Sequence, residues 1–221
     1  MHKDLLIFDL DGTLIDSSSD IAWAANKTLS HMGHKEETVE HIRQNIGWGV
    51  TALLEKLLPD EGPDVITVAR EKFLEVYASH LVVDTYIYPD VRETIRHFSE
   101  KGKKMAVVTN KPEGLSIKIL EEFGLSGSFL MVVGGDTLPS RKPDPAPLLK
   151  VINDLRVEAA AAVFIGDSPI DSETGKKAGV FTIGVEPPQG VPYGYRGNVN
   201  LVDIGFDLLV KDFRELQSVI E

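Results

Sequence analysis

The sequence predicts an α/β fold, a Rossmann-like doubly wound parallel sheet with a helical insertion after its first strand. Beyond residue 88, apolar runs of strand length alternate with helical segments, which indicates a parallel sheet covered on both faces. The long stretch between the first two strands repeats apolar residues at helical spacing. The chain has 221 residues, 43% of them hydrophobic, which is enough for one folded core and a small insertion.

The first strand is expected at residues 4–9, where an uninterrupted apolar run has the length of a buried strand. Ser17 and the polar residues after it are typical N-caps for the first inserted helix. The inserted helices are expected at residues 17–33, 37–46, 50–58 and 65–81, with a loop at 59–64. We therefore expect a helical domain at residues 16–84, inserted into a core domain made of residues 1–15 and 85–221.

The rest of the chain predicts alternating elements that follow one another at short intervals. The expected strands are residues 105–108, 130–133, 162–165, 181–183 and 208–210. The expected helices are residues 91–101, 113–123, 146–155, 170–178 and 212–220. Residues 186–197 are rich in proline and glycine, so they are predicted to form a loop. This order is typical of an open sheet with helices on both sides.

Composition excludes several classes of function. The net charge of −11 argues against nucleic acid or an anionic membrane as the main partner. The absence of cysteine excludes disulfides, thiolate catalysis and cysteine-based zinc sites. No apolar stretch approaches membrane-spanning length, and the chain starts directly with a strand-like run. We expect a cytoplasmic monomer or homodimer whose partner is a small molecule.

Two acids follow the first strand, at the point where the apolar run ends. Asp9 and Asp11 lie two residues apart, so in an extended chain their side chains share a face. Held close together they repel each other unless a cation or a proton intervenes. This arrangement predicts a Mg²⁺ site with one carboxylate free to attack phosphorus. The alternative is that both acids are turn formers and Gly12 supplies a positive φ angle.

Polar residues also follow two later strands and precede a helix. They are Thr109, Asn110, Lys142, Asp167, Ser168 and Asp171. Because the carboxyl ends of parallel strands lie along one edge of a doubly wound sheet, we expect these groups to converge there. Taken singly, each has an ordinary structural alternative. Thr109 and Asn110 are compatible with a helix cap, Lys142 with a solvated loop, and Asp167 with an N-cap.

The residue types suggest a role for each group. Asp9 is the candidate nucleophile that forms an aspartyl-phosphate, and Asp11 is the candidate acid and base for the leaving oxygen and for water. Thr109 is expected to hold phosphate oxygens, and Lys142 to place a positive charge on the transferring group. Asp167 is expected to complete an oxygen-rich Mg²⁺ site. Around that site, Asp171 and Ser168 are expected to orient metal-bound water.

The motifs together resemble the haloacid dehalogenase superfamily of phosphatases. The resemblance covers nearly the whole chain and is carried by residues 9–13, 109–110, 142–144 and 166–171. It implies that Mg²⁺ is held by Asp9, by the backbone carbonyl of Asp11 and by Asp167. It also implies that Thr13 and Asn110 contact the substrate. The dehalogenases of this superfamily lack the second aspartate, so Asp11 favours phosphate chemistry.

The inserted helices resemble the cap of that superfamily, which closes over the site and excludes bulk water. Residues 108–112 and 134–145 are similar to bacterial phosphoglycolate phosphatases, which makes 2-phosphoglycolate the favoured substrate. Gly47, Trp48 and Gly49 match a cap loop that is expected to face the substrate, where the glycines let backbone N–H groups approach an anion. Arg43 is a candidate partner for a substrate carboxylate. The alternatives are a Trp48 that packs between helices and a solvated arginine.

Several other functions remain open at this stage. A phosphosugar mutase, a pyrophosphatase or a nucleotidase of the same superfamily would carry the same motifs. A signalling module that is phosphorylated on an aspartate also gathers acids, a hydroxyl and a lysine. Such modules are shorter and lack a helical insertion after the first strand, and they do not turn over repeatedly.

Overall fold

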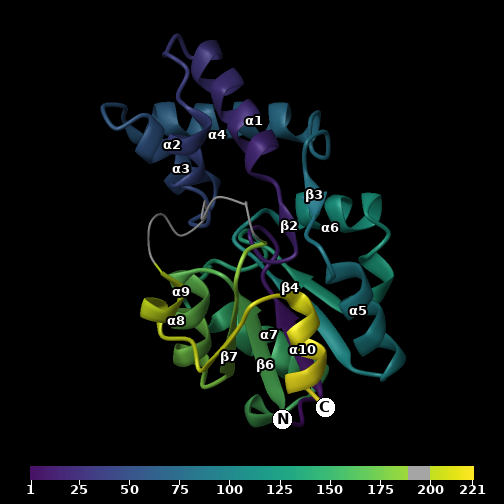
Figure 1. Ribbon diagram of the computed structural model, residues 1–221. Coiled ribbons are helices and arrows are strands. Elements are labelled where there is room, and N and C mark those ends of the chain that lie inside the picture. The colour runs from purple at the N-terminus through teal and green to yellow at the C-terminus, as the bar shows by residue number, and fades with distance from the viewer. Residues whose placement is uncertain (189–199) are drawn as a thin grey trace.

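The computed structural model, which describes residues 1–188 and 200–221, has a six-stranded parallel sheet at its centre (Figure 1). The strand order is β5-β4-β1-β6-β7-β8, and every neighbouring pair is parallel. The strands are β1 (Leu5–Phe8), β4 (Lys104–Val108), β5 (Met131–Val133), β6 (Ala162–Gly166), β7 (Phe181–Val185) and β8 (Leu208–Val210). From β1 the chain first adds β4 and β5 on one side and then β6, β7 and β8 on the other. This change of side at β1 is the topological switch point, where ligands bind in such sheets.

Helices cover both faces of this sheet. The helices of this part are α5 (Val91–Glu100), α6 (Glu113–Glu122), α7 (Ala146–Leu155), α8 (Pro169–Ala178), α9 (Leu201–Ile204) and α10 (Phe213–Val219). Side chains alternate between the faces along β1. Leu6 and Phe8 pack with residues of α5, α6 and α10, whereas Leu5 and Ile7 pack with residues of α7 and α8. Both sets are fully buried, which explains why β1 is apolar at every position.

The inserted segment forms a separate group of helices, drawn above the sheet in Figure 1. It consists of α1 (Ser18–His31), α2 (Val39–Arg43), α3 (Val50–Leu57) and α4 (Pro63–Ala78). Two short antiparallel strands, β2 (Ile15–Asp16) and β3 (Tyr86–Ile87), carry the chain into the insertion and out of it. These linkers lie next to the predicted boundaries of the helical domain, and the division into two domains stays a prediction.

The predicted fold class is confirmed, and the other predicted helices and strands lie close to their expected bounds, but the helix predicted at residues 37–46 is shorter, since α2 spans only Val39–Arg43. The short elements β2, β3 and α9 were not predicted, because two to four residues are too few to show a period. The predicted loop at residues 59–64 is wrong at its end, since α4 begins at Pro63. Proline suits the first helical turn, where its missing N–H has no partner to lose. The predicted loop at residues 186–197 lies outside the described residues from Gln189 onward.

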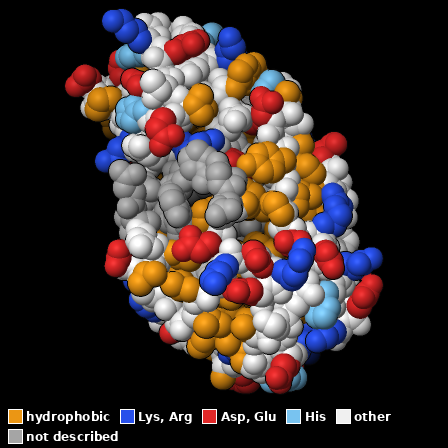
Figure 2. Space-filling view, viewed as in Figure 1, with side chains coloured by type: hydrophobic (Ala, Val, Ile, Leu, Met, Phe, Trp, Pro, Cys, Tyr) orange, Lys and Arg blue, Asp and Glu red, His pale blue; other side chains and the backbone are white. Residues whose placement is uncertain are grey.

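Acidic and basic side chains are interspersed over the face shown in Figure 2. Several apolar side chains gather beside the junction between the insertion and the sheet in that view. In the two described segments, no helix combines the length and the apolar composition needed to cross a bilayer.

A buried carboxylate at the start of α1 holds the end of the insertion in place. Asp20 is fully buried and accepts hydrogen bonds from the backbone N–H groups of Val83, Asp84 and Thr85 at 2.9–3.1 Å. The Thr85 hydroxyl donates a further hydrogen bond to the same carboxylate at 2.6 Å. One side chain therefore satisfies the polar groups of the segment that leads into β3.

Replacing Asp20 with Ala is expected to lower the free energy of unfolding by about 2–4 kcal/mol, because several buried donors lose their charged acceptor together. Chemical denaturation followed by circular dichroism measures this loss. Asp84→Asn is the matched control, because Asp84 is exposed and contributes its backbone N–H rather than its carboxylate. Equal stability of the Asp20→Ala variant and the unaltered protein would contradict this role.

Candidate active site

The carboxyl ends of three neighbouring strands bring distant acids to one edge of the sheet. In the register of the sheet, Phe8 of β1 lies opposite Val107 of β4 and Ile165 of β6. Asp9 therefore leaves the sheet beside the residues that follow β4 and β6. Carboxylate oxygens of Asp9, Asp167 and Asp171 lie within 4.8 Å of one another.

Lys142 lies within this acidic cluster. Its Nζ is 2.8 Å from Oδ1 of Asp9 and 2.7 Å from Oδ1 of Asp171. Lys142 is 2% exposed, so its ammonium is largely removed from water. Burial opposes the charged form of Lys142, but the carboxylates of Asp171 and Asp9 outweigh it, and the pKa of Lys142 lies above its ordinary value. The lysine is therefore a fixed positive charge beside the candidate nucleophile.

Asp171 is held by the loop that it stabilises. Its Oδ2 accepts hydrogen bonds from the backbone N–H of Ser168 at 3.1 Å and from the Ser168 hydroxyl at 2.6 Å, in a capping box at the start of α8. A Cβ atom at Gly166 would lie 2.5 Å from Cγ of Asp171, so only glycine permits this approach. Asp171 and Ser168 thus position Lys142 and the loop that carries Asp167.

The donor set of this cluster fits a divalent cation. Asp9, Asp167 and Asp171 are buried carboxylates that share one ammonium, so the cluster carries excess negative charge in a place that water does not screen. Oxygen ligands of this kind suit Mg²⁺. Asp167 also accepts a hydrogen bond from the Thr13 hydroxyl at 2.7 Å, which fixes the orientation of its carboxylate. The arrangement therefore favours Asp9 and Asp167 as the ligands.

The electrostatic surroundings of Asp9 suppress its ionisation. Burial raises the pKa of Asp9 to about 7, although the neighbouring Lys142 opposes the shift. A bound cation would favour the ionised form, so metal and proton compete for this carboxylate.

Mg²⁺ affinity is therefore expected to fall as the pH drops through the pKa of Asp9, which lies at about 7. Because the proton must leave before the metal binds, the dissociation constant should be about tenfold higher at pH 6 than at pH 8. Calorimetric titration of the protein with MgCl₂ at the two pH values measures the difference. An equal dissociation constant at both would show that Asp9 does not exchange its proton for the metal.

Asp11 lies in the same pocket but faces a different cation. Directly after Asp11, the chain turns at Gly12, which has a φ of +89°. Asp11 Oδ1 accepts a hydrogen bond from the Ser17 hydroxyl at 2.5 Å. Lys111 Nζ is 2.9 and 3.0 Å from the two oxygens of the Asp11 carboxylate. The carboxylate of Asp11 is thus not part of the acidic cluster, and only its backbone oxygen remains a candidate metal ligand.

Asn110 connects the sheet to the inserted helices. Its Nδ2 donates to the backbone oxygens of Gly47 and Lys142, both at 2.9 Å. Gly49 has a φ of +90°, and a Cβ atom there would lie 3.3 Å from the backbone oxygen of Asn110. The loop between α2 and α3 therefore rests directly on the residues that follow β4.

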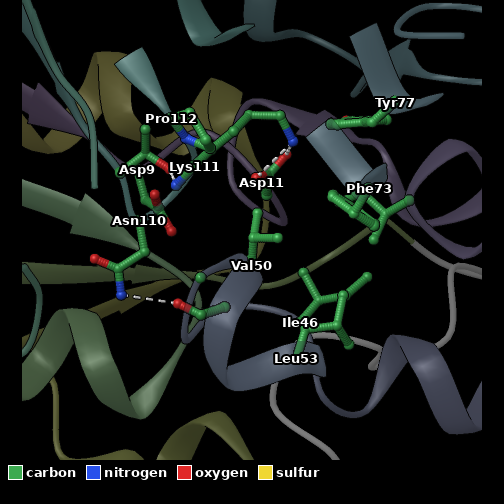
Figure 3. Close-up of a pocket in the computed structure, with 14 residues that line it drawn as sticks. Asp9, Asp11, Ile46, Val50, Leu53, Phe73, Tyr77, Asn110, Lys111 and Pro112 are labelled. Carbon is green, nitrogen blue, oxygen red and sulfur yellow. Dashed lines mark hydrogen bonds and ion pairs between the residues drawn. The ribbon is translucent and has the colours of Figure 1, made fainter. Parts of the chain in front are cut away.

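These contacts border a partly open pocket with a volume of about 50 Å³ between the sheet edge and the insertion. Figure 3 shows Asp9, Asp11 and Lys111 on one side of it and the side chains of the inserted helices on the other. The lining residues are Asp9, Asp11, Ile21, Ile46, Gly47, Gly49, Val50, Leu53, Phe73, Tyr77, Thr109, Asn110, Lys111 and Pro112. The structure thus brings together the predicted residues Asp9, Asp11, Thr109, Asn110, Gly47 and Gly49 around one cavity.

Three predicted substrate contacts, Thr13, Arg43 and Trp48, are not among the residues that line the pocket. Trp48 is 49% exposed. Arg43 donates a hydrogen bond to Ser18 Oγ at 2.7 Å and does not line the pocket either. A local pattern could not indicate which way these side chains point. Contact of these residues with substrate stays a prediction.

The sequence analysis missed three side chains at this site. Lys111 directly follows the predicted site residues Thr109 and Asn110, and only this position in the sequence could have indicated a role at the site. Ser17 is a residue type typical of helix N-caps, and Tyr77 recurs at the spacing of core residues in α4, so both sequence patterns indicate a structural role instead. All three side chains are buried, at 6%, 0% and 2% exposure.

Comparisons with known proteins agree with this geometry. Residues 6–185 match the family described as haloacid dehalogenase-like hydrolase. The chain is 45% identical over 182 residues to a phosphoglycolate phosphatase of Aquifex aeolicus, covering 80% of this chain and 82% of that protein. It is 37% identical over 220 residues to a phosphoglycolate phosphatase of Pseudomonas fluorescens, covering 96% and 78%. A crystal structure of a predicted phosphoglycolate phosphatase from Haemophilus somnus superposes with a TM-score of 0.90 at 28% identity, covering 98% and 97%.

Proposed function

The chain belongs to the haloacid dehalogenase-like hydrolases, and from this membership we propose that it is a Mg²⁺-dependent phosphomonoesterase that acts through an aspartyl-phosphate. The observation that carries the proposal is the convergence of Lys142 and the acidic cluster on Asp9, which itself lines the pocket. Such a group supplies a nucleophile, a fixed positive charge and oxygen ligands for a cation within reach of one phosphate.

In the first step, a carboxylate oxygen of Asp9 attacks phosphorus. The new oxygen–phosphorus bond forms as the bond to the leaving oxygen breaks, and Asp11 supplies the proton that the leaving alcohol needs. Lys142 offsets the charge that builds up on the phosphoryl oxygens. Thr109 lines the same end of the pocket and is placed to donate its hydroxyl hydrogen to one of these oxygens.

In the second step, water attacks the phosphorus of the aspartyl-phosphate. Asp11 takes a proton from that water, the bond between Asp9 and phosphorus breaks, and inorganic phosphate leaves. The contact between Asn110 and the backbone of Gly47 keeps the insertion over the pocket, which limits the access of other water molecules.

When bound, Mg²⁺ would be held by Asp9 and Asp167 and would neutralise negative charge on the transferring group. Asp171 and Lys142 hold this end of the pocket in shape through their 2.7 Å ion pair.

The favoured substrate is 2-phosphoglycolate, the substrate in the names of the similar proteins from Aquifex aeolicus and Pseudomonas fluorescens. The similarity to the Pseudomonas fluorescens protein covers 96% of this chain and so includes the insertion, which is expected to face the leaving group. The partner is thus a small phosphorylated metabolite.

The test is a phosphate-release screen over phosphorylated acids, sugars, nucleotides and pyrophosphate, with Mg²⁺ and with EDTA. We expect many turnovers per protein molecule, the highest kcat/KM with 2-phosphoglycolate, and no release in EDTA. A single turnover would instead indicate a phosphoaspartate signalling module. Isomerisation of a hexose phosphate without release of phosphate would indicate a mutase. Either result would overturn the proposal.

A further inference from the structure

Lys111 brings a buried ammonium to the wall of the pocket, whereas Lys142 lies beside Asp9 but does not line the pocket. Its Nζ lies 2.9 and 3.0 Å from the carboxylate oxygens of Asp11, so two of its three N–H groups are directed at that residue. Figure 3 shows the Lys111 side chain extending over Asp11 toward Tyr77. The third N–H group is not engaged by Asp11 and lies on the side of Tyr77. Lys142 lies at the other acid, Asp9, so the two lysines serve different ends of the site.

Tyr77 meets Lys111 from the inserted helix α4. The Nζ of Lys111 is 4.8 Å from the centre of the Tyr77 ring, within the range of a cation–π contact. Tyr77 is 2% exposed, and its hydroxyl lies near Lys111 and Ser17 without a hydrogen bond of good geometry to either. A buried hydroxyl without a partner costs free energy unless something else in the site satisfies it. The ammonium and the hydroxyl therefore form an incomplete polar pair at the edge of the pocket.

The remaining wall on the side of the insertion is apolar. It consists of Ile21, Ile46, Val50, Leu53 and Phe73. Among the described residues that line the pocket, Lys111 is the only cation, and the other charged ones are Asp9 and Asp11. The hydroxyl groups of a sugar or a nucleoside would lose their hydrogen bonds to water against these side chains without gaining new ones. A short carbon chain would lose nothing there.

We propose that Lys111 and Tyr77 form the binding site for a carboxylate on the leaving group, so that the enzyme selects phosphate monoesters of short hydroxy acids. The phosphate lies at Asp9 and Lys142, the carboxylate accepts hydrogen bonds from Nζ of Lys111 and the hydroxyl of Tyr77, and the carbon atoms face the apolar wall. This inference rests on the proposed phosphatase function and assigns a specificity-determining role to two residues within it.

The test compares two esters that differ in one group, 2-phosphoglycolate and ethyl phosphate. Ethyl phosphate carries a methyl group in place of the carboxylate. For the unaltered enzyme with Mg²⁺, we expect a kcat/KM at least about 10-fold higher for 2-phosphoglycolate, since a charge-assisted contact is made by that ester alone. The ratio of the two kcat/KM values isolates this contact, because any disturbance of Asp11 affects both esters.

Three variants locate the contact. Lys111→Met keeps the length of the side chain without its charge and should lower the ratio by about 10- to 100-fold, mainly through KM for 2-phosphoglycolate. Tyr77→Phe removes the hydroxyl and keeps the ring, and should lower the ratio by about 3- to 10-fold. Lys118→Met replaces an exposed lysine of α6 and should leave the ratio unchanged.

Each other outcome is informative. If Lys111→Met lowers kcat/KM equally for both esters, the lysine acts only through Asp11 and the inference is overturned. If the unaltered enzyme hydrolyses both esters equally well, the inference fails while the proposed function stands. If neither ester releases phosphate, both fail. Should Lys111→Met not fold, the ratios of the unaltered enzyme and of Tyr77→Phe still decide the question.

Discussion

Replacing Asp9 with Asn is expected to lower phosphate release with 2-phosphoglycolate by at least about 10⁴-fold. The amide has nearly the shape of the carboxylate but is no nucleophile, so no aspartyl-phosphate can form. The substitution also removes one of the two carboxylate ligands assigned to Mg²⁺. Steady-state phosphate release at saturating Mg²⁺ measures the loss. Asp154→Asn is the matched control, because Asp154 is an exposed residue of α7 that pairs with Lys150 on the surface.

Loss of fold should not explain this effect. Asp9 is one of three buried carboxylates that share the ammonium of Lys142. Because burial raises the pKa of Asp9 to about 7, its ionised form is disfavoured in the folded protein, and the metal-free protein loses stability as the pH rises from about 4 toward that value. At pH 8 in EDTA, the Asp9→Asn variant should therefore unfold at the same temperature as the unaltered protein or above it. Undiminished turnover by this variant would end the covalent mechanism.

Replacing Lys142 with Met should have the second largest effect. Lys142 is the cation beside both Asp9 and Asp171, at 2.8 and 2.7 Å. Without it, the phosphoryl group loses its fixed positive partner, and we expect kcat to fall by about 10²- to 10⁴-fold. Two carboxylates also lose a buried partner, which should lower the free energy of unfolding by about 3–5 kcal/mol in EDTA.

Two measurements separate these effects of Lys142. Mg²⁺ should restore part of the lost stability, because a divalent cation also offsets the charge of the cluster, but it should not restore kcat. Lys150→Met should change neither quantity much, since Lys150 forms a surface ion pair with Asp154. A Lys142→Met enzyme within threefold of the original kcat would show that the lysine stabilises the loop and has no part in catalysis.

The strands and the chemistry at their ends are predictable from the sequence because both depend on local patterns. An apolar run that ends in Asp9 and Asp11 indicates a buried strand followed by a functional loop, whatever the rest of the chain does. The topology rule for parallel sheets then brings Asp167 to the same edge. The structure places these groups together, and the 45% identity to the Aquifex aeolicus protein supports the same family.

The pairing of the charged side chains was decided by the tertiary structure alone. Asp9 and Asp11 are two residues apart and were expected to face a common cation, yet one pairs with Lys142 and the other with Lys111. The partners come from distant parts of the chain: Lys111 lies 100 residues after Asp11, just beyond β4, and Lys142 lies in the segment before α7.

The same limit applies to the insertion. Trp48 lies in the loop that covers the pocket, and Arg43 in the helix just before it, but neither lines the pocket, whereas Tyr77, which has the spacing of a core residue, reaches Lys111. Helical periodicity shows which residues share a face, because it depends on neighbours within a turn or two. Which surface that face meets depends on how the insertion packs against the sheet, and no local pattern records that packing.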